Sequence, residues 1–559
     1  MNRERCAGAA VLLILSCLAP ATEAAVQTLS PADQSIIENR QRALLEQAKA
    51  LRESLQNQTD LPVVTSSSQA NAGDACHPVK QIRFRQSAHL PAGVQAALAR
   101  SWQNRCLTLA QINTLIRETT AAYLERGYIT SQAWLPEQDI SGGELIIAVS
   151  EGRIESVTLN GDTPLAVRMA MPAGAEQVLN LRDLEQGLEQ LNRLRSAQVT
   201  IDIQPGTLPG YSRVVLVPAD KKSSVGVSVS ADNSGQKSTG TAQLAASLTV
   251  ENPLHLADLW QFSASRDGEF RHDRRSRSLT GSVSIPYGYW LLSGQTGWND
   301  FYQQIPLQQA SYRYAGSALS QRFSVGRTLL RDGRQKLAFE TALSRRRSEN
   351  RLAGEKLSVS SPTITGLSGT LNYSRSAGGG WLTLSPSLSH GLHVLGATPD
   401  APDRPGLPRS GFRKYSLSAS YFLPLSSSVW YLTSFYGQTT PDNLWASERI
   451  SVGGQYSVRG FKEQYLTGNR GAYWRNELTW QIASSASFGG LSLTGALDIG
   501  RVQKEAERVE GGSVAGAALG LGLSGGLFSQ SVTVGKPLLS PDSLQPDAWV
   551  AWWQAGITF

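Results

Sequence analysis

The chain has 559 residues, of which 17% are charged, and it holds 52 glycines but only 3 methionines and 4 cysteines. Its mean hydropathy of −0.22 excludes a strongly polar chain and a bundle of continuously apolar helices, and it suits strands in which apolar and polar residues alternate. The formal charge of +7 fits loops near anionic lipid. No motif of a nucleic-acid-binding module accompanies this charge, so we expect no nucleic-acid partner.

Residues 1–24 have the pattern of a secretory signal peptide. Arg3 and Arg5 precede an apolar run at 7–19, which is too short to be a membrane span. Small residues follow, and cleavage after Ala21 and cleavage after Ala24 both fit them. No later segment reaches the ~18 consecutive apolar residues that a membrane helix needs, which leaves the chain able to reach an outer membrane.

The four cysteines divide between the signal peptide and the mature chain. Cys6 and Cys17 lie in the signal peptide, where Cys17 also makes a weak match to a lipoprotein processing site. Cys76 and Cys106 remain, 30 positions apart and outside any CxxC motif. In an oxidising compartment such a pair predicts one structural disulfide. In the chain-entropy model a loop of this length contributes roughly 3–4 kcal/mol of stability.

Residues 25–58 are predicted to form a helix, followed by a flexible linker at 59–75. Ser30 supplies an N-cap, and Pro31 suits the first helical position. The apolar residues from there to Gln56 form a narrow stripe surrounded by charged and amide side chains. A coiled-coil or surface helix would show this pattern, and so would a helix lodged in a polar lumen; both interpretations stay open. Serine, proline and glycine in the next segment are typical of a tether.

Two consecutive segments repeat one plan. In the first repeat (76–150), a strand at 79–84 precedes a capping box formed by Thr108 and Gln111. This box opens a helix that runs to Arg126, and strands at 129–135 and 144–149 follow.

In the second repeat (151–220), a strand at 154–159 meets the turn pair Asn160-Gly161, and Asn180 caps a leucine-rich helix. Strands at 199–204 and 211–217 complete the repeat. Each repeat is thus a small α+β domain with a β-helix-β-β core. The sheets could be inert scaffolds, but their edges could also accept an extended strand from a partner, and we favour partner binding.

From about residue 221 to Phe559 the hydrophobic period becomes two. Val225, Val227 and Val229 alternate with small or polar residues, and in the last segment Trp549, Ala551, Trp553, Ala555, Ile557 and Phe559 share one parity. At ~20 residues per strand and connection, this region predicts an antiparallel transmembrane β-barrel of about 16 strands. A soluble sandwich or propeller is the rival interpretation, but no regular blade repeat is visible.

Catalytic patterns are weak throughout. His390 and His393 fall on opposite faces of a strand, which argues against a shared metal ion. GxGxxG at 520–525 and GxSxG at 522–526 lack the strand–turn–helix context that their chemistry requires. Because these patterns lack their structural context, we expect no enzymatic activity, no cofactor and no metal site. The sequence contains no P-loop, so we also expect no nucleotide-driven transport. Arginine-rich runs at 271–277 and 345–347 are interpreted as solvated loop or lumen charges.

One loop carries the candidate site. Val458-Arg459-Gly460-Phe461 lies between predicted barrel strands, and downstream Asp498 and Gly500 interrupt an apolar alternating strand. A carboxylate on a barrel strand should face the lumen, because lipid penalises charge. A buried or lumenal pair between Arg459 and Asp498 would hold the loop in place, and loss of one partner would leave the other charge stranded.

These motifs resemble those of the two-partner secretion transporters (TpsB family), the type that exports hemolysins, filamentous hemagglutinin and contact-dependent inhibition toxins. The motif at 458–461 resembles the signature of their long inward-folded loop, and Asp498 and Gly500 resemble their paired strand motif, although Ala496 stands where an aromatic is common. Segments at 127–136, 151–154 and 181–192 resemble parts of their two POTRA domains. The resemblance covers nearly the whole mature chain.

The resemblance implies an outer-membrane translocator with periplasmic POTRA domains. It implies that residues 30–57 plug the barrel at rest and leave through the linker. The POTRA domains would bind the N-terminal secretion domain of one large exoprotein (an adhesin, hemolysin or contact-dependent toxin). This exoprotein would cross the lumen in extended form and without nucleotide hydrolysis. Outer-membrane lipid and the barrel-assembly machinery are further expected partners. A barrel-assembly insertase is the alternative, but such proteins usually carry more POTRA domains and lack the plug helix.

Overall fold

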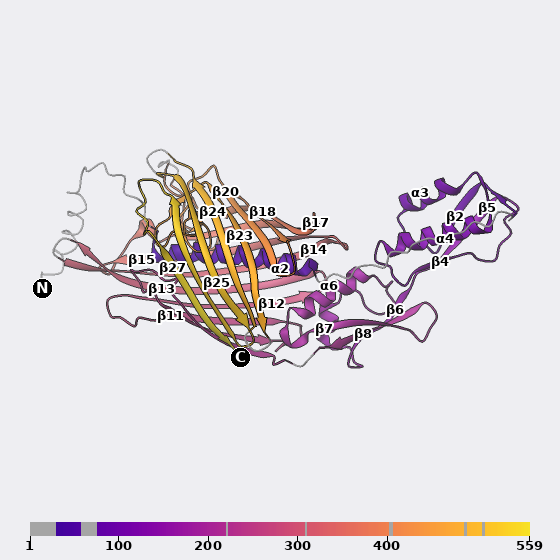
Figure 1. Cartoon of the computed structure of the whole chain (residues 1–559), viewed down its shortest axis with the longest axis horizontal. Coiled ribbons are helices and arrows are strands. Elements are labelled where there is room, and N and C mark those ends of the chain that lie inside the picture. Colours follow the sequence, from indigo (N-terminus) through magenta and orange to yellow (C-terminus); the bar gives the residue numbers. More distant parts are fainter. Residues whose placement is uncertain are drawn as a thin grey trace.

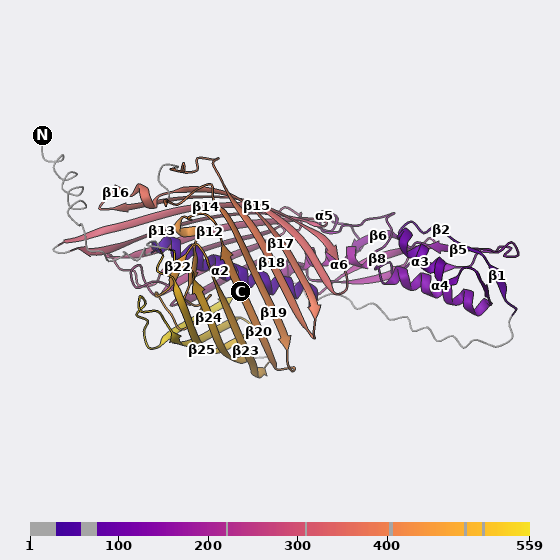
Figure 2. The ribbon, with the colours of Figure 1, turned by 90° about the horizontal axis from the view of Figure 1, so that it is seen from above.

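The computed structural model describes residues 29–56, 75–219, 222–307, 310–401, 406–485, 489–505 and 509–559. It consists of a β-barrel, a helix that runs inside the barrel, and two small α+β domains that extend from one end of it (Figures 1 and 2). The predicted signal peptide and most of the predicted linker lie outside the described residues. Among the described helices, none is long and apolar enough to cross a membrane.

The first described element is α2 (Pro31–Gln56), with the bounds that the cap and the apolar stripe predict. The backbone N–H of Asp33 donates to the Ser30 hydroxyl at 3.1 Å, so the N-cap is formed. Both views place α2 inside the barrel, along its length (Figures 1 and 2). At 26 residues it is about 39 Å long, enough to extend through the barrel wall's membrane zone. Of the two interpretations left open by the sequence, the lumenal one is correct.

The first repeat folds as a three-stranded sheet covered by helices, with a small additional two-stranded sheet. Its elements are β1 (His77–Val79), β2 (Gln81–Arg85), α3 (Ala92–Trp102), β3 (Arg105–Leu107), α4 (Leu109–Leu124), β4 (Gln132–Trp134) and β5 (Glu144–Ser150). The sheet order is β2-β5-β4, and β1 pairs with β3. The capping box at Thr108 and Gln111 is present. Cys76 and Cys106 are joined by a disulfide that ties the start of β1 to β3.

Two details of this repeat differ from the sequence expectation. The single strand expected at 79–84 is two short strands, β1 and β2, which pair with different partners. Helix α3 was not predicted, because it follows Pro91 without a side-chain cap and has no fully buried residue. It packs on the core through half-buried side chains such as Val94 and Leu98.

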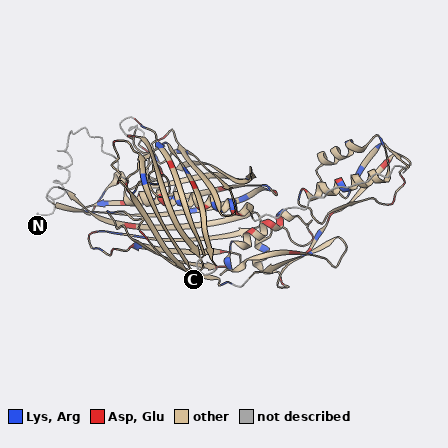
Figure 3. Ribbon diagram, in the orientation of Figure 1, with Lys and Arg blue, Asp and Glu red and all other residues tan. Residues whose placement is uncertain are grey.

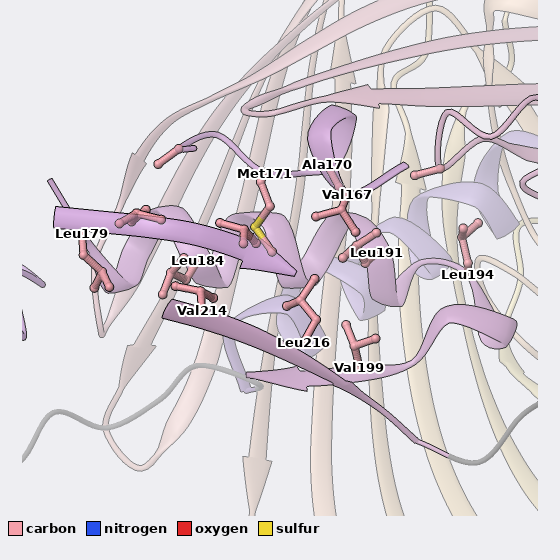
Figure 4. Close-up of a cluster of buried hydrophobic side chains, with 14 residues drawn as sticks. Val167, Ala170, Met171, Leu179, Leu184, Leu191, Leu194, Val199, Val214 and Leu216 are labelled. Atoms are coloured by element: carbon pink, nitrogen blue, oxygen red, sulfur yellow. The ribbon is translucent and has the colours of Figure 1, made fainter. Parts of the chain in front are cut away.

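The second repeat consists of β6 (Arg153–Leu159), α5 (Leu165–Ala170), α6 (Leu181–Asn192), η1 (Arg195–Ala197), β7 (Val199–Pro205) and β8 (Tyr211–Pro218). Its sheet order is β6-β8-β7. The apolar face of α6 packs on the sheet through Leu184 and Leu191, and α5 closes the core through Val167 and Ala170 (Figure 4). The short helix α5 was not expected from the sequence, and Leu194 lies just beyond the end of α6.

The side chain of Asn180 is one of those that connect the two repeats. Asn180 caps α6 by accepting from the backbone N–H of Arg182 at 2.8 Å, and its amide nitrogen donates to the carbonyl of Arg126 at 3.0 Å, at the end of α4. The N–H of Leu181 also donates to the carbonyl of Gly127 at 2.8 Å. The cap of one domain's helix therefore fixes the end of the other domain's helix.

The barrel wall contains sixteen antiparallel strands among the described residues. They are β9 (Val225–Asp232), β10 (Gln243–Glu251), β11 (Leu259–Asp267), β12 (Arg275–Tyr287), β13 (Trp290–Leu307), β14 (Ala310–Arg331), β15 (Gln335–Leu352), β17 (Thr363–Ala377), β18 (Gly380–Leu392), β19 (Arg413–Pro424), β20 (Val429–Thr439), β23 (Gly471–Ser485), β24 (Gly489–Val502), β25 (Gly512–Gly525), β26 (Phe528–Leu539) and β27 (Val550–Thr558). A two-residue strand, β16 (Glu355–Lys356), turns back and pairs antiparallel with the end of β15. The barrel closes where β27 pairs with β9.

Side chains alternate across this wall as the period of two predicts. In β27, Trp553 is exposed on the outside, whereas its neighbour Trp552 is buried. In β9, Val225, Val227 and Val229 are all exposed. An apolar outer surface facing lipid and a polar inner surface are the requirements of a transmembrane barrel. The glycine-rich segment at 520–525 lies within β25, so its resemblance to a nucleotide-binding motif has no structural basis.

Candidate functional site

The candidate site is an inward loop, residues 440–470, which connects the neighbouring wall strands β20 and β23. It contains η3 (Ala446–Glu448) and a short hairpin of β21 (Ile450–Val452) and β22 (Leu466–Gly468). The predicted motif, Val458 to Phe461, lies between these two strands at the tip. Val458, Arg459 and Phe461 are buried, so the tip is packed against other parts of the protein.

Arg459 binds Asp498 of β24 with the full fork of its guanidinium. Nε donates to Oδ2 at 2.6 Å and Nη2 donates to Oδ1 at 2.6 Å, while the backbone N–H of Arg459 donates to Oδ2 at 3.0 Å. The carboxylate of Asp498 is fully buried, with 0% of its side chain exposed. A bidentate pair that also engages the backbone fixes the orientation of the loop tip as well as its position.

Two further charged residues complete this network, and sequence reasoning missed both. Nη1 of Arg459 lies 3.1 Å from Glu477 of β23, and Arg475 donates to the same Glu477 oxygen at 2.8 Å. Arg475 also reaches the carbonyl of Gln455 in the loop at 3.3 Å. The sequence did contain a signal: Arg475 and Glu477 occupy the lumenal parity of β23, opposite the exposed Trp474 and Leu478.

Glycines on the barrel wall allow the loop to approach this closely. A Cβ at Gly500 would overlap the side chain of Val452, and a Cβ at Gly516 would overlap the carbonyl oxygen of Arg459. Gly460 itself has φ +109°, a conformation that favours glycine, and its backbone lies against Lys536. Gly500 was singled out in the sequence for its motif; its physical role is to leave room for the β21 side chain.

An apolar cluster covers the charged network. Val458 and Phe461 pack with other fully or mostly buried residues from the loop and the wall: Tyr436, Ile450, Val452, Leu466, Tyr473, Val502, Val509 and Val514. Such a dry cover strengthens the ion pair beneath it, because the local dielectric is low. Leu44 of α2 contacts the same cluster from the lumen.

Helix α2 is held in the lumen by scattered polar contacts to the wall. Asp33 pairs with Arg346 of β15 at 2.8 Å, Gln47 donates to Asn372 of β17 at 3.0 Å, and the Arg52 guanidinium lies 4.1 Å from the ring centre of Phe422. The arginine run at 345–347 is therefore a wall segment, of which Arg346 faces the lumen and binds the helix. Figure 3 shows charged residues distributed along the helix.

The middle of the same helix, residues 40–42, contacts the inward loop. Arg40 donates to the carbonyl of Arg449 at 2.8 Å and lies 3.6 Å from Glu448, while Gln41 donates to the carbonyl of Ser451 at 2.8 Å. The Arg42 guanidinium lies 4.9 Å from the ring centre of Tyr456. One turn of the plug helix therefore rests on the segment that leads into the loop motif.

Acidic residues of α6 bind two basic residues and a tyrosine at the end of the barrel from which the α+β domains extend. Glu189 lies 2.6 Å from Arg331 and 2.5 Å from Lys336, and Asp183 accepts a hydrogen bond from Tyr289. Figure 3 shows this acidic patch where the domain meets the barrel. Burial raises the pKa of Glu189, but attraction to Lys336 and Arg331 outweighs burial and lowers that pKa below its ordinary value. The second repeat is thus docked through ion pairs in which the two cations are buried and the carboxylate is partly buried.

The described residues offer no arrangement suited to a metal ion, since no group of three or more histidine, cysteine, aspartate or glutamate side chains comes together among them. His393 pairs with Asp400 at 3.0 Å instead of with His390. The site consists of a fixed loop and a lumenal helix that contact each other inside the barrel.

Three comparisons place this architecture among known proteins. Residues 210–523 match the haemolysin secretion/activation family ShlB/FhaC/HecB, and residues 77–152 and 153–205 match POTRA domains, the first of them of the ShlB type. The two repeats are accordingly the first and second POTRA domains. The outer membrane transporter CdiB of Dickeya dadantii is 39% identical over 95% of both chains, and the hemolysin transporter ShlB of Serratia marcescens is 29% identical over 87% of this chain and 84% of its own.

A solved structure agrees with the sequence matches. CdiB from Escherichia coli superposes with a TM-score of 0.92 and 38% identity, covering 96% of this chain and all of the other. CdiB from Acinetobacter baumannii, at 23% identity, has the same fold with a TM-score of 0.79 over 95% of this chain and all of its own. The chain belongs to the ShlB/FhaC/HecB family of two-partner secretion proteins: it is an outer-membrane transporter whose POTRA domains lie in the periplasm and whose sixteen-stranded barrel is the translocation channel.

Proposed function

We propose that this transporter exports one large exoprotein of the contact-dependent inhibition class. The observation that supports this class is the difference in similarity: 39% identity to CdiB over nearly the whole chain, against 29% to the hemolysin transporters. The POTRA domains bind the exoprotein's N-terminal secretion domain in the periplasm, by adding its strands to an exposed sheet edge. Export uses no nucleotide and no catalytic or cofactor chemistry, because folding of the exoprotein outside the cell gives the direction.

The gate of this channel has two parts with different roles. Helix α2 leaves the lumen to admit the exoprotein, and the 59–75 segment, which lies almost entirely outside the described residues, serves as its tether. The pair between Arg459 and Asp498, with Gly460, Gly500, Val458 and Phe461 around it, holds the inward loop against the wall. Outer-membrane lipid surrounds the barrel, and the barrel-assembly machinery inserts it.

The role of Arg459 is tested by Arg459→Ala in cells that also express an exoprotein of the contact-dependent inhibition class. We expect the barrel to insert normally and the surface delivery of the exoprotein to fall at least ten-fold, since Asp498 and Glu477 lose their shared cation. Arg322→Ala is the matched control: Arg322 is also lumenal and paired, with Glu340 at 2.6 Å, but it does not belong to the loop network. Normal export by Arg459→Ala would refute this role.

The cargo class is tested separately. Secretion domains from a contact-dependent inhibition toxin and from a hemolysin are each fused to one reporter and expressed with this transporter in a strain that has no other. We expect export of the first to exceed that of the second. Equal export, or export of the hemolysin fusion alone, would overturn the assignment of the cargo and leave the transporter function intact.

A further inference from the structure

A cleft of about 540 Å³ lies between the second POTRA domain and the hairpin that joins β12 to β13. One wall comes from β6, from α5 and from the segment 171–175 that follows α5; the other comes from residues 287–290 and from Arg327 of β14. The backbone N–H of Gly288 donates to the carbonyl of Met169 at 2.8 Å and fixes the spacing of the two walls. The transport steps described above make no use of this cleft.

The barrel wall of the cleft belongs to the lipid-facing surface. Trp290 is opposite Arg327 in the strand register, and Arg327 is opposite Phe339, so these three side chains share the outer face. Tyr287 and Phe339 are exposed, as is Trp290 at 38%. Exposed tryptophan and tyrosine at the end of a barrel mark the boundary between hydrocarbon and headgroups. The cleft therefore opens onto the periplasmic leaflet at headgroup depth.

The charges in the cleft favour an anion. Arg327 lines it with its guanidinium 4.9 Å from the ring centre of Trp290, and Arg168 of α5 lines it from the POTRA side. Among the described residues that line it, the acidic one is Glu155, whose carboxylate already accepts from the backbone N–H of Thr207 at 2.5 Å and from its hydroxyl at 3.1 Å. Two guanidiniums beside aromatic rings suit a phosphate group that arrives with apolar chains.

We propose that this cleft binds the phosphodiester headgroup of a phospholipid from the periplasmic leaflet. Arg327 and Arg168 bind the phosphate from opposite walls, and the acyl chains lie along the outer face of β12–β14 beside Tyr287 and Trp290. A polypeptide is a poorer occupant, because one side of the cleft is continuous with the hydrocarbon zone, where unpaired backbone groups are costly. The bound lipid would fasten the second POTRA domain to the membrane surface as well as to the barrel.

Two kinds of variant test the site by different routes. Arg168→Gln combined with Arg327→Gln removes both cations. Gly174→Phe blocks the cleft without changing charge, and no heavy atom lies within 4 Å of a Cβ built at Gly174, so the ring has room to enter. The control, Arg100→Gln with Arg105→Gln, removes two exposed arginines from the first POTRA domain and leaves the cleft untouched.

The full-length transporter is purified in detergent, and folding of its barrel is checked by its heat-modifiable migration in gel electrophoresis. Phosphatidylglycerol, diacylglycerol or inorganic phosphate is then added, and the bound molecules are counted by native mass spectrometry. We expect phosphatidylglycerol to bind the original protein and the control about equally, and the double arginine variant and Gly174→Phe at least ten-fold more weakly; ten-fold corresponds to about 1.4 kcal/mol. Equal retention by all four proteins would overturn the proposal. The proposal would also be overturned if diacylglycerol bound as tightly as phosphatidylglycerol does. It would likewise be overturned if inorganic phosphate at equal concentration displaced phosphatidylglycerol.

Discussion

The plug helix α2 and the inward loop both occupy the lumen, but they are held there in different ways. The loop tip is fixed by one bidentate ion pair, with Asp498 fully buried, beneath a continuous apolar cluster. The helix is held by separate polar contacts, such as Asp33 with Arg346 and Gln41 with Ser451, and only Leu44 joins the apolar cluster. Residues 457–461 at the loop tip are all buried, whereas the helix has many side chains that remain partly exposed.

This difference indicates which part can leave the pore. Water can replace the polar contacts of α2 one at a time, and each contributes about 1 kcal/mol or less. Release of the loop would expose a buried carboxylate and its apolar cover together, which is a much larger cost. We therefore expect the helix to exchange in and out of the lumen while the loop moves only as a unit. Four substitutions test this contrast, ordered here by the size of the expected effect.

Asp498→Asn should have the largest effect. It leaves the Arg459 cation buried with Glu477 as its remaining carboxylate, at a cost of about 4 kcal/mol to the folded loop. We expect a lower midpoint in urea unfolding and strongly reduced export. Asp300→Asn is the control, because Asp300 also binds two arginines, Arg275 and Arg277, but on the outer wall. If both variants lost stability and export to the same extent, the ion pair of the loop would contribute no more than an ion pair on the outer wall.

Glu189→Gln tests whether ion pairs also fix a contact outside the lumen, the one between α6 of the second POTRA domain and the barrel. Arg331 and Lys336 would lose their shared carboxylate, and because Glu189 is 27% exposed we expect a cost of about 2 kcal/mol and a broader range of POTRA–barrel distances by spin-label measurement. Glu125→Gln, on an exposed helix end of the first POTRA domain, is the control. An unchanged distance distribution in Glu189→Gln would show that other contacts suffice.

The same contact has a definite pH dependence. The pKa of Glu189 is lower in the docked state than its ordinary value, because attraction to Lys336 and Arg331 exceeds the effect of burial. A lowered pKa means that the carboxylate stabilises docking fully above its ordinary pKa and loses that contribution as the pH falls through the lowered value. Spin-label distances should therefore broaden only in acid, below the ordinary range of a glutamate, and should not respond to pH in this way in Glu189→Gln.

Gly500→Ala tests the close approach of the loop to the wall. The new methyl group overlaps Val452, and we expect a cost of about 1.5 kcal/mol together with a changed channel conductance in planar bilayers, because the hairpin is pushed away from the wall. Gly495→Ala introduces the same methyl group in the same strand, where nothing lies within 4 Å of it. Conductance that is the same in both variants would contradict the packing role of Gly500.

Asp33→Asn should have the smallest effect, on the frequency of channel opening. It weakens one ion pair of α2, and a loss of about 1 kcal/mol corresponds to roughly a five-fold increase in the open fraction. Glu53→Gln removes a carboxylate from the exposed end of the same helix, where it pairs only weakly with Lys49 at 3.7 Å. If Asp33→Asn abolished closure altogether, α2 would be held by one contact and not by several.

Local features of the fold could be predicted from the sequence. The Ser30 cap and Pro31 gave the start of α2, and Thr108 with Gln111 gave the start of α4, because capping depends on residues three positions apart. The alternation at Val225–Val229 and Trp549–Phe559 gave the barrel, because side chains of a strand alternate between two faces whatever lies beyond them. Helices α3 and α5 were missed because both lack a side-chain cap. In addition, α3 has no fully buried residue that would mark an apolar face, and α5 has only six residues.

The site was only partly predictable, for a physical reason. The parity of Asp498 in an apolar strand showed that it faces the lumen, and the motif at 458–461 identified its loop. Glu477 and Arg475 take part in the network because of which strands are neighbours and in which register they pair. The space that Gly516 leaves for the Arg459 backbone depends on the same pairing. Those relations are long-range, and no local pattern specifies them.

By itself, then, the sequence determined the order of the parts: exported chain, polar helix, two α+β domains, and a barrel with alternating faces. The tertiary structure alone decided where the helix lies, because an amphipathic stripe specifies that one face is covered without specifying by what. It likewise decided the docking of α6 on Arg331 and Lys336, and the cleft between α5 and Arg327. Each of these features is made by surfaces far apart in the chain, whose complementarity exists only after both have folded.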